Sequence, residues 1–195
     1  ALAPALGSDI PEVVRSARLV HTGPLMSDPV MQVDIRSFHE ENIYYADSSF
    51  LSMFSYQMIS GDADEALAQP GSIVISESMA NKYFPNQNAI DQLLTFHRGD
   101  LGSTLLKVTG IYADIPKNSH LHTDFLISFN SLPKNWNLDE NWGWGNFYNY
   151  VEVVPDTNPD LIRDKIATVI ESYQGEKLAE WRKAGYVRTT DIQPI

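Results

Sequence analysis

Residues 70–84 of the chain are PGSIVISESMANKYF, and this stretch joins a turn, a strand and a helix without a break. Pro-Gly is turn chemistry, and the β-branched run Ile73–Ile75 is typical of a buried strand. Ser76 follows at the position where a helix cap is expected, and Met79 and Tyr83 then recur at helical spacing. The stretch therefore predicts a buried strand that feeds directly into a short helix.

Strand-like segments separated by turns flank this stretch on both sides. Most of them alternate apolar and polar residues or are rich in β-branched and aromatic residues, as strands with one buried face are. The expected strands are Arg15–His21, Val30–Phe38, Ile43–Ala46, Leu93–His97, Leu105–Ala113, Asp124–Asn130, Tyr148–Val154 and Tyr186–Ile192.

Helical patterns alternate irregularly with these strands. Asn158-Pro159 opens the longest helix, because Asn caps helices and Pro favours the first turn, and we expect Gly175 to interrupt it. The irregular alternation predicts an α+β fold, with a mixed sheet and packed helices. The apolar stripe of the long helix is Ile162, Ile166, Val169, Ile170 and Tyr173, and shorter helices are expected from Ser8–Glu12 with Asp9 as cap, after Asp47 as cap, and over Asp64–Ala68.

The composition excludes several classes of protein. Of 195 residues, 43% are hydrophobic and 20% charged, which is enough apolar material for a packed core. The net charge of −11 repels a nucleic-acid backbone, so we expect no nucleic-acid partner. Cysteine is absent, which excludes disulfides and thiolate metal sites.

No stretch approaches the roughly 20 consecutive apolar residues that a membrane helix needs. Residues 1–10 lack the basic flank of a signal peptide. The chain therefore has the composition of a soluble acidic domain. The same composition is expected of the extramembrane part of a larger membrane protein.

The segment from Asp47 to Leu94 resembles the MacB-like periplasmic core domain of bacterial ABC-transporter permeases of the FtsX, MacB and lipoprotein-release type. A second block, Val108–His122, and the closing Asp191–Pro194 are similar to the same family, in the version typical of Bacteroidetes. The matching residues of the first block are Gly61, Asp62, Ala66, Leu67, Pro70, Ser72, Ile73, Val74, Ser76, Glu77, Ser78, Ala80, Lys82, Tyr83 and Phe84.

The chain departs from the family pattern at two turns. Phe84 is followed by Pro85 where the family has Phe-Gly, and Ala89-Ile90-Asp91 stands where the family has Pro-Ile-Gly. These turns are therefore expected to lack a glycine in the left-handed conformation.

The resemblance implies an architecture and a location. Residues 1–46 and 123–195 would form a split, membrane-proximal base, and residues 47–122 an inserted upper lobe. The domain would be the periplasmic part of an inner-membrane permease, with one membrane helix before Ala1 and three after Ile195.

The resemblance also implies a role and partners. The domain would transmit ATP-driven conformational change and contact substrate or periplasmic partners, without being an enzyme or carrying a cofactor. ATP hydrolysis would occur on a separate nucleotide-binding subunit or domain. Further partners would be a second permease copy, and a periplasmic adaptor or lipoprotein.

The segment 135–150 holds six aromatic residues interleaved with asparagines. Such a segment packs over a core, anchors a protein interface or stacks on sugars. Core packing is the commonest of these arrangements, and a glycan-binding module is the alternative function for the whole chain. The residues that we assign to an interface are Trp136, Trp142, Trp144 and Phe147.

Catalytic and metal-binding motifs are weak. His120, His122 and Asp124 form an H-x-H-x-D pattern, which on a strand directs alternate residues to one side and would suit a metal-dependent hydrolase. A turn in which the histidines bond the backbone is the simpler interpretation. No phosphate-binding glycine loop or G-x-S-x-G motif is present, and Ser76 is better explained as a helix cap than as a nucleophile.

Overall fold

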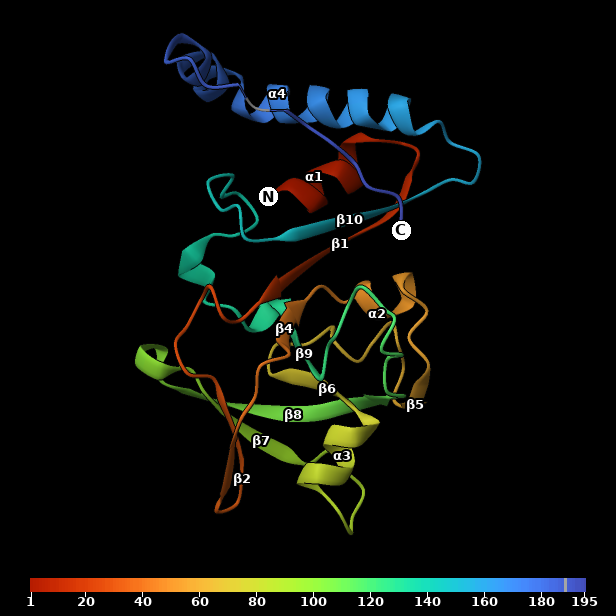
Figure 1. The fold of residues 1–195 in the computed structure, drawn as a ribbon, viewed down its shortest axis with the longest axis vertical. Coiled ribbons are helices and arrows are strands. Elements are labelled where there is room, and N and C mark those ends of the chain that lie inside the picture. The colour runs from red at the N-terminus through yellow and green to blue at the C-terminus, as the bar shows by residue number, and fades with distance from the viewer. Residues whose placement is uncertain (188) are drawn as a thin grey trace. The chain divides into compact units, whose positions relative to one another are not determined.

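The computed structural model describes residues 1–187 and 189–195, and they form two compact units. The larger unit holds residues 17–136 and 146–148. The smaller unit holds residues 1–16, 137–145 and 149–195. Figure 1 shows the elements of each unit along the chain.

The larger unit is built on a mixed sheet, as predicted. Ile43–Ala46 pairs in parallel with Phe125–Ser128, and Ser72–Ser76 pairs in parallel with Lys107–Tyr112. Other neighbouring strands of the same sheet pair antiparallel. The order is β1 (Val13–His21), β4 (Ile43–Ala46), β9 (Phe125–Ser128), β6 (Ser72–Ser76), β8 (Ser103–Tyr112), β7 (Leu93–His97), β2 (Val30–Val33) and β3 (Arg36–His39), and β5 (Met58–Ser60) pairs with β8.

The strand and helix of residues 70–84 lie at the centre of this unit. All five residues of β6 are buried. The Ser76 Oγ accepts a hydrogen bond from the Met79 N–H at 3.3 Å and begins α3 (Glu77–Tyr83), so the predicted cap is confirmed. The buried Tyr83 ring meets Phe125 of β9 edge-on, with centroids 5.7 Å apart, which ties the helix to the sheet.

Residues 30–38 are a hairpin and not the single strand that was predicted. β2 and β3 pair so that Val33 faces Arg36, which leaves Asp34 and Ile35 as a two-residue loop. Asp34 adopts a φ of 52°, and Asp tolerates this left-handed conformation better than most residues. The alternation of apolar and polar residues continues through this two-residue turn, so the sequence pattern could not reveal that the chain reverses direction there.

Two expected helix starts were wrong. The N-terminal helix, α1 (Leu2–Asp9), ends where the sequence suggested a beginning. Asp47 does not cap α2 (Phe50–Met53), which has Ser49 at its N-cap position. The carboxylate of Asp47 binds Arg18 instead. Residues 64–68 form turns rather than a helix.

The smaller unit packs α1 against the long helix α4 (Pro159–Lys183). The Asn158 side chain accepts from the Asp160 N–H at 2.9 Å, which confirms the predicted start. The predicted apolar stripe of α4 is buried at Ile162, Ile166, Val169 and Ile170, whereas Tyr173 is 52% exposed. β10 (Tyr148–Val153) lies beside β1 in the sheet order. The apolar cluster of this unit comprises Ala5, Leu6, Ile10, Val13, Ile162, Ile166, Val169, Ile170 and Leu178.

Two predictions concerned the C-terminal part of the chain. Gly175 does not interrupt α4, which is assigned as one helix through Lys183. The strand expected over residues 186–192 is absent from its described residues, and position 188 of that segment lies outside them.

The predicted lobes can be compared with the two units. Residues 47–122, the expected inserted lobe, all lie in the larger unit, together with residues 17–46, 123–136 and 146–148. Which part is nearer to a membrane stays a prediction. Within the described residues, no helix is long and apolar enough to cross a membrane.

The departure from the family pattern at Asp91 has a structural counterpart. Asp91 stands where the family has glycine, and its φ is 65°, so a non-glycine residue takes the left-handed conformation there. Its carboxylate lies 3.2 Å from the Lys107 ammonium. The turn is therefore retained without the glycine.

Gly61 is expected to tolerate no side chain. Its φ is 86°, and a Cβ would lie 2.5 Å from the Thr109 carbonyl oxygen. Because the left-handed conformation alone costs about 1–2 kcal/mol in an L-residue, we expect Gly61→Ala to lower the free energy of unfolding by about 2 kcal/mol or more. Urea unfolding measures the loss. Gly145→Ala is the control, because a Cβ there meets no atom within 4 Å; equal losses in both variants would contradict the account.

Candidate functional site

β1 belongs to both units. Its residues 13–16 lie in the smaller unit and its residues 17–21 in the larger one. β1 is therefore one of the segments that connect the two units covalently; the chain also passes between them at residues 136–137, 145–146 and 148–149. The contacts that hold each end of β1 decide how firmly the strand is attached to each unit.

In the larger unit, Arg18 attaches β1 to the chain before α2. The Arg18 Nε and Nη2 atoms donate to the two carboxylate oxygens of Asp47 at 2.8 and 2.9 Å. The backbone N–H of Arg18 donates to the same carboxylate at 2.8 Å, and the Asp47 N–H donates back to the Arg18 carbonyl at 3.1 Å. Such a paired geometry is the strong form of an ionic hydrogen bond.

The Arg18 guanidinium also lies over an aromatic ring. Its central carbon is 3.8 Å from the centroid of Phe129. The side chains of Arg18 and Asp47 are only 8% and 21% exposed, so water screens the pair little. Carboxylate, guanidinium and ring thus join β1, the segment between β4 and α2, and the turn that follows β9 in one contact.

In the smaller unit, Glu12 attaches the chain just before β1. The Lys165 ammonium of α4 donates to the Glu12 carboxylate. The hydrogen bond from Lys165 lowers the pKa of Glu12 below its ordinary value, and a backbone hydrogen bond contributes to the same shift to a smaller extent. Arg15 adds a second contact on β1, with its Nε 3.3 Å from Glu152 of β10.

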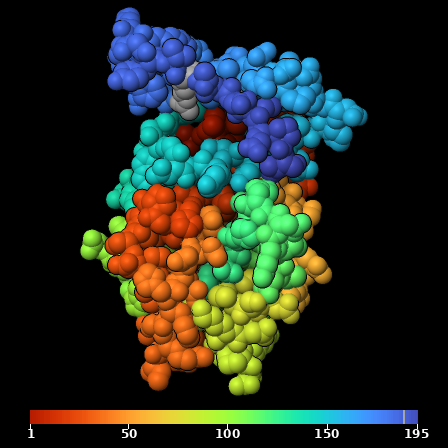
Figure 2. Space-filling view, in the orientation of Figure 1, coloured from red at the N-terminus to blue at the C-terminus, as the bar shows by residue number. Residues whose placement is uncertain are grey.

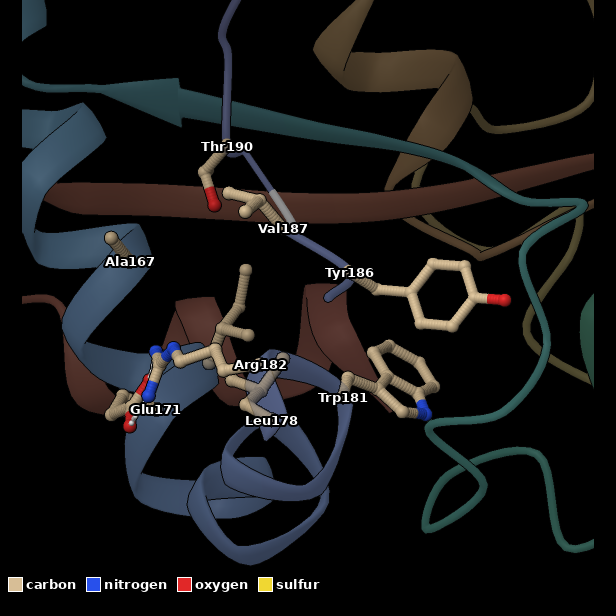
Figure 3. A pocket seen from close by; sticks show the side chains of 9 residues that line it. Ala167, Glu171, Leu178, Trp181, Arg182, Tyr186, Val187 and Thr190 are labelled. Carbon is tan, nitrogen blue, oxygen red and sulfur yellow. Dashed lines mark hydrogen bonds and ion pairs between the residues drawn. The ribbon is translucent and has the colours of Figure 1, made fainter. Parts of the chain in front are cut away.

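α4 changes direction along its length. Arg182 donates to both carboxylate oxygens of Glu171 at 3.1 and 2.6 Å, although the two residues are 11 positions apart. A straight helix would separate their Cα atoms by about 16 Å, beyond the combined reach of the side chains. Figure 3 shows the two side chains meeting, so the helix must bend between them. Gly175 lies in this interval, and glycine is a common site of helix bending.

A hollow of about 110 Å³ lies inside this bend. Trp181 and Tyr186 border it, and Figure 3 shows their rings on the same side of the hollow. The hollow is smaller than the roughly 300 Å³ of a small-molecule pocket. Its charged residues, Glu171 and Arg182, are already paired. We therefore assign it no ligand.

The aromatic segment 135–150 contributes to packing in the smaller unit. Trp142 stacks on Tyr173 of α4, with centroids 4.9 Å apart and ring planes 23° apart. The Trp142 carbonyl accepts from the Gln174 side chain at 3.3 Å. One face of the Trp142 ring is therefore covered by the chain itself, which is the core-packing arrangement. Binding of a glycan or a partner by the remaining surface stays a prediction.

The other interface candidates are partly buried. Phe147 packs against Phe129 within the larger unit, with centroids 5.8 Å apart. Trp136 and Trp144 are half-buried. Nothing in these contacts tests an interface role, which stays a prediction.

The H-x-H-x-D residues do not converge. His120 and His122 are exposed, and the Asp124 carboxylate accepts from the Asn42 side chain at 2.9 Å. Among residues 1–187 and 189–195, no group of three or more histidines and carboxylates is placed to hold a metal.

Sequence reasoning missed both attachments of β1. Arg18 and Asp47 are 29 positions apart, and Glu12 and Lys165 are 153 apart, so no local motif joins them. Because Asp often caps helices, the sequence indicated the backbone of the following helix, and not Arg18, as the partner of Asp47.

The chain is similar to a known family along most of its length. The profile of the family described as "MacB-like periplasmic core domain" matches residues 1–169. No curated protein sequence matches the chain.

Several solved structures share the fold. A domain assigned to a permease protein of Porphyromonas gingivalis has a TM-score of 0.72 and 24% identity, over 89% of this chain and 76% of that one. The periplasmic region of MacB from Actinobacillus actinomycetemcomitans has a TM-score of 0.63 and 13% identity, over 95% and 82%. The extracellular domain of the noncanonic ABC-type transporter YknZ from Gram-positive bacteria has a TM-score of 0.60 and 13% identity, over 89% of this chain and 82% of that one.

Removing the Asp47 carboxylate is expected to destabilise the larger unit strongly. Asp47→Ala leaves the Arg18 guanidinium buried without its counter-ion, and breaking a buried pair in this way costs about 3–5 kcal/mol. The free energy of unfolding in urea measures the cost. The control is Asp91→Ala, which removes one partner of the pair between Lys107 and Asp91, whose side chains are 54% and 75% exposed. Loss of such an exposed pair should cost less than about 1 kcal/mol. Similar losses for both variants would refute a special role for Arg18.

Glu12 is expected to titrate below its ordinary pKa of 4.5. Because its pKa is lower in the folded chain, the pair with Lys165 stabilises fully above that ordinary value, and its contribution is lost as pH falls through the folded value. NMR titration of the Glu12 side-chain carboxyl measures the midpoint. Lys165→Met should move the midpoint up towards 4.5, and an unchanged midpoint would show that Lys165 does not hold the carboxylate.

Proposed function

Because the chain belongs to the family of MacB-like periplasmic core domains, we propose that it is the periplasmic domain of an inner-membrane ABC-transporter permease. The family consists of transporter permease domains rather than enzymes. In this proposal the chain catalyses no reaction and relays movement driven by ATP on another subunit or domain.

The attachment of β1 at both of its ends is the observation that supports a mechanical role most directly. Arg18 is held by Asp47 and Phe129 in the larger unit, and Glu12 by Lys165 in the smaller one. A strand held this way passes a displacement of one unit on to the other instead of sliding. Well-packed elements with discrete attachments are what rigid-body transitions require.

The proposal includes partners. The ATPase would act through the membrane part of the permease, and a second permease copy would place two of these domains face to face. A periplasmic adaptor or lipoprotein would contact the outer surface. Trp136, Trp142, Trp144 and Phe147 are the residues that we propose for such contacts.

Distances between two copies test the relay. Because the chain has no cysteine, cysteines introduced at the exposed Asp100 and Glu176 would be the only labelling sites within this domain. In the reconstituted permease with its ATPase, we expect the spin-label distances between copies to shift when ATP is trapped.

A catalytically inactive ATPase is the control, and it should leave the distances at their nucleotide-free values. Identical distributions with and without trapped ATP, in a complex that hydrolyses ATP, would refute the relay. Hydrolysis of ATP by this chain alone would also refute the division of labour.

A further inference from the structure

A cleft in the larger unit lies between the loop that joins α2 to β5 and the segment that follows β8. It encloses about 320 Å³, at the lower end of the range for small-molecule sites. Phe54 and Tyr56 line it from the first loop, and Asp114 and His120 from the second segment. The cleft therefore combines aromatic rings with one carboxylate.

The aromatic wall is held by the core behind it. Phe54 packs on the buried Phe50, with centroids 4.8 Å apart, and its centroid is 6.3 Å from that of His120. Tyr56 meets Tyr112 edge-on at 5.0 Å. Ser55 between them has a φ of 51°, a strained conformation for a residue other than glycine. The wall is thus built before any ligand arrives.

Asp114 lines the cleft, and its carboxylate pairs with no lysine or arginine among the described residues. Asp114 accepts from the Ser78 N–H at 3.0 Å and from the Ser78 hydroxyl at 2.5 Å. These hydrogen bonds lower the pKa of Asp114. Both donors are neutral groups, and within the described part of the chain no lysine or arginine pairs with Asp114.

Elsewhere in the larger unit the chain completes the same combination with its own cations. The Arg18 guanidinium binds a carboxylate and lies 3.8 Å above the Phe129 centroid. The Lys82 ammonium binds Glu40 at 2.6 Å and lies 4.7 Å from the Phe38 centroid. At the cleft, Asp114 and the rings are present, and no lysine or arginine is among the described residues that line it.

We propose that this cleft binds a guanidinium group on an apolar stem, as an arginine side chain presents it. The planar cation would pair with the Asp114 carboxylate while its stem and face lie against Phe54 and Tyr56. Guanidinium suits the site better than ammonium, because it stacks on rings and is more weakly hydrated. The inference concerns the cleft alone and does not depend on the proposed relay.

Titration of the isotope-labelled chain with N-acetyl-arginine amide tests the proposal. We expect saturable NMR shifts at the amides of Asp114, Ser119 and His120. N-acetyl-norleucine amide, which keeps the apolar stem without the charge, should bind at least about tenfold more weakly, as the loss of an ionic hydrogen bond predicts.

Three variants separate charge, ring and general electrostatics. Asp114→Asn retains an acceptor for Ser78 and should weaken binding at least about tenfold. Phe54→Leu should weaken it less, because it removes one ring and leaves the charge. Asp100→Asn is the matched control: like Asp114→Asn it removes one negative charge, but from an exposed position away from the cleft, and it should bind like the unmodified chain. Far-UV circular dichroism establishes that each variant is folded.

The source of the cation is decided by two further probes. Equal affinity for butylguanidinium and for acetyl-Ala-Arg-Ala amide would assign the cleft to small free cations, and tighter binding of the peptide would assign it to an arginine of a partner. Equal binding of the arginine and norleucine probes, undiminished in a folded Asp114→Asn variant, would overturn the proposal. Absence of shifts with every probe would overturn it as well.

Discussion

The buried contact of Arg18 with Asp47 and Phe129 is the constraint on which the arrangement of the larger unit depends. With one side chain it fixes β1, the chain before α2 and the turn that follows β9. The ion pair alone need not add net stability, because both charges lose hydration. Its consequence is specificity: with the charges buried, any arrangement that separates them is strongly disfavoured. β1, which has residues in both units, is thereby held in the larger one.

The smaller unit uses the same kind of attachment at a more exposed place. Glu12 and Lys165 hold the beginning of β1 against α4, and Glu171 and Arg182 hold the bend of α4. Ion pairs that are partly open to water are weaker and more sensitive to salt than a buried one. The two ends of β1 are therefore attached with unequal strength.

Local signals predicted the elements whose cause is local. The Ser76 cap, the buried strand around Ile73–Ile75 and most of the apolar stripe of α4 follow from spacing and capping chemistry, and the irregular alternation of strands and helices predicted the α+β class. The hairpin at Asp34, the partner of Asp47 and the cleft around Asp114 could not be predicted. Each depends on residues far apart in the chain or on a single backbone angle, and neither leaves a periodic pattern.

The most direct test of the relay uses the reconstituted permease carrying Asp47→Asn, assayed below its unfolding temperature. ATP hydrolysis and the ATP-dependent change in label distance between copies are measured on the same sample. The account predicts that hydrolysis persists while the distance change becomes smaller, because β1 is held less firmly in the larger unit. A full-sized distance change in this variant would contradict the account.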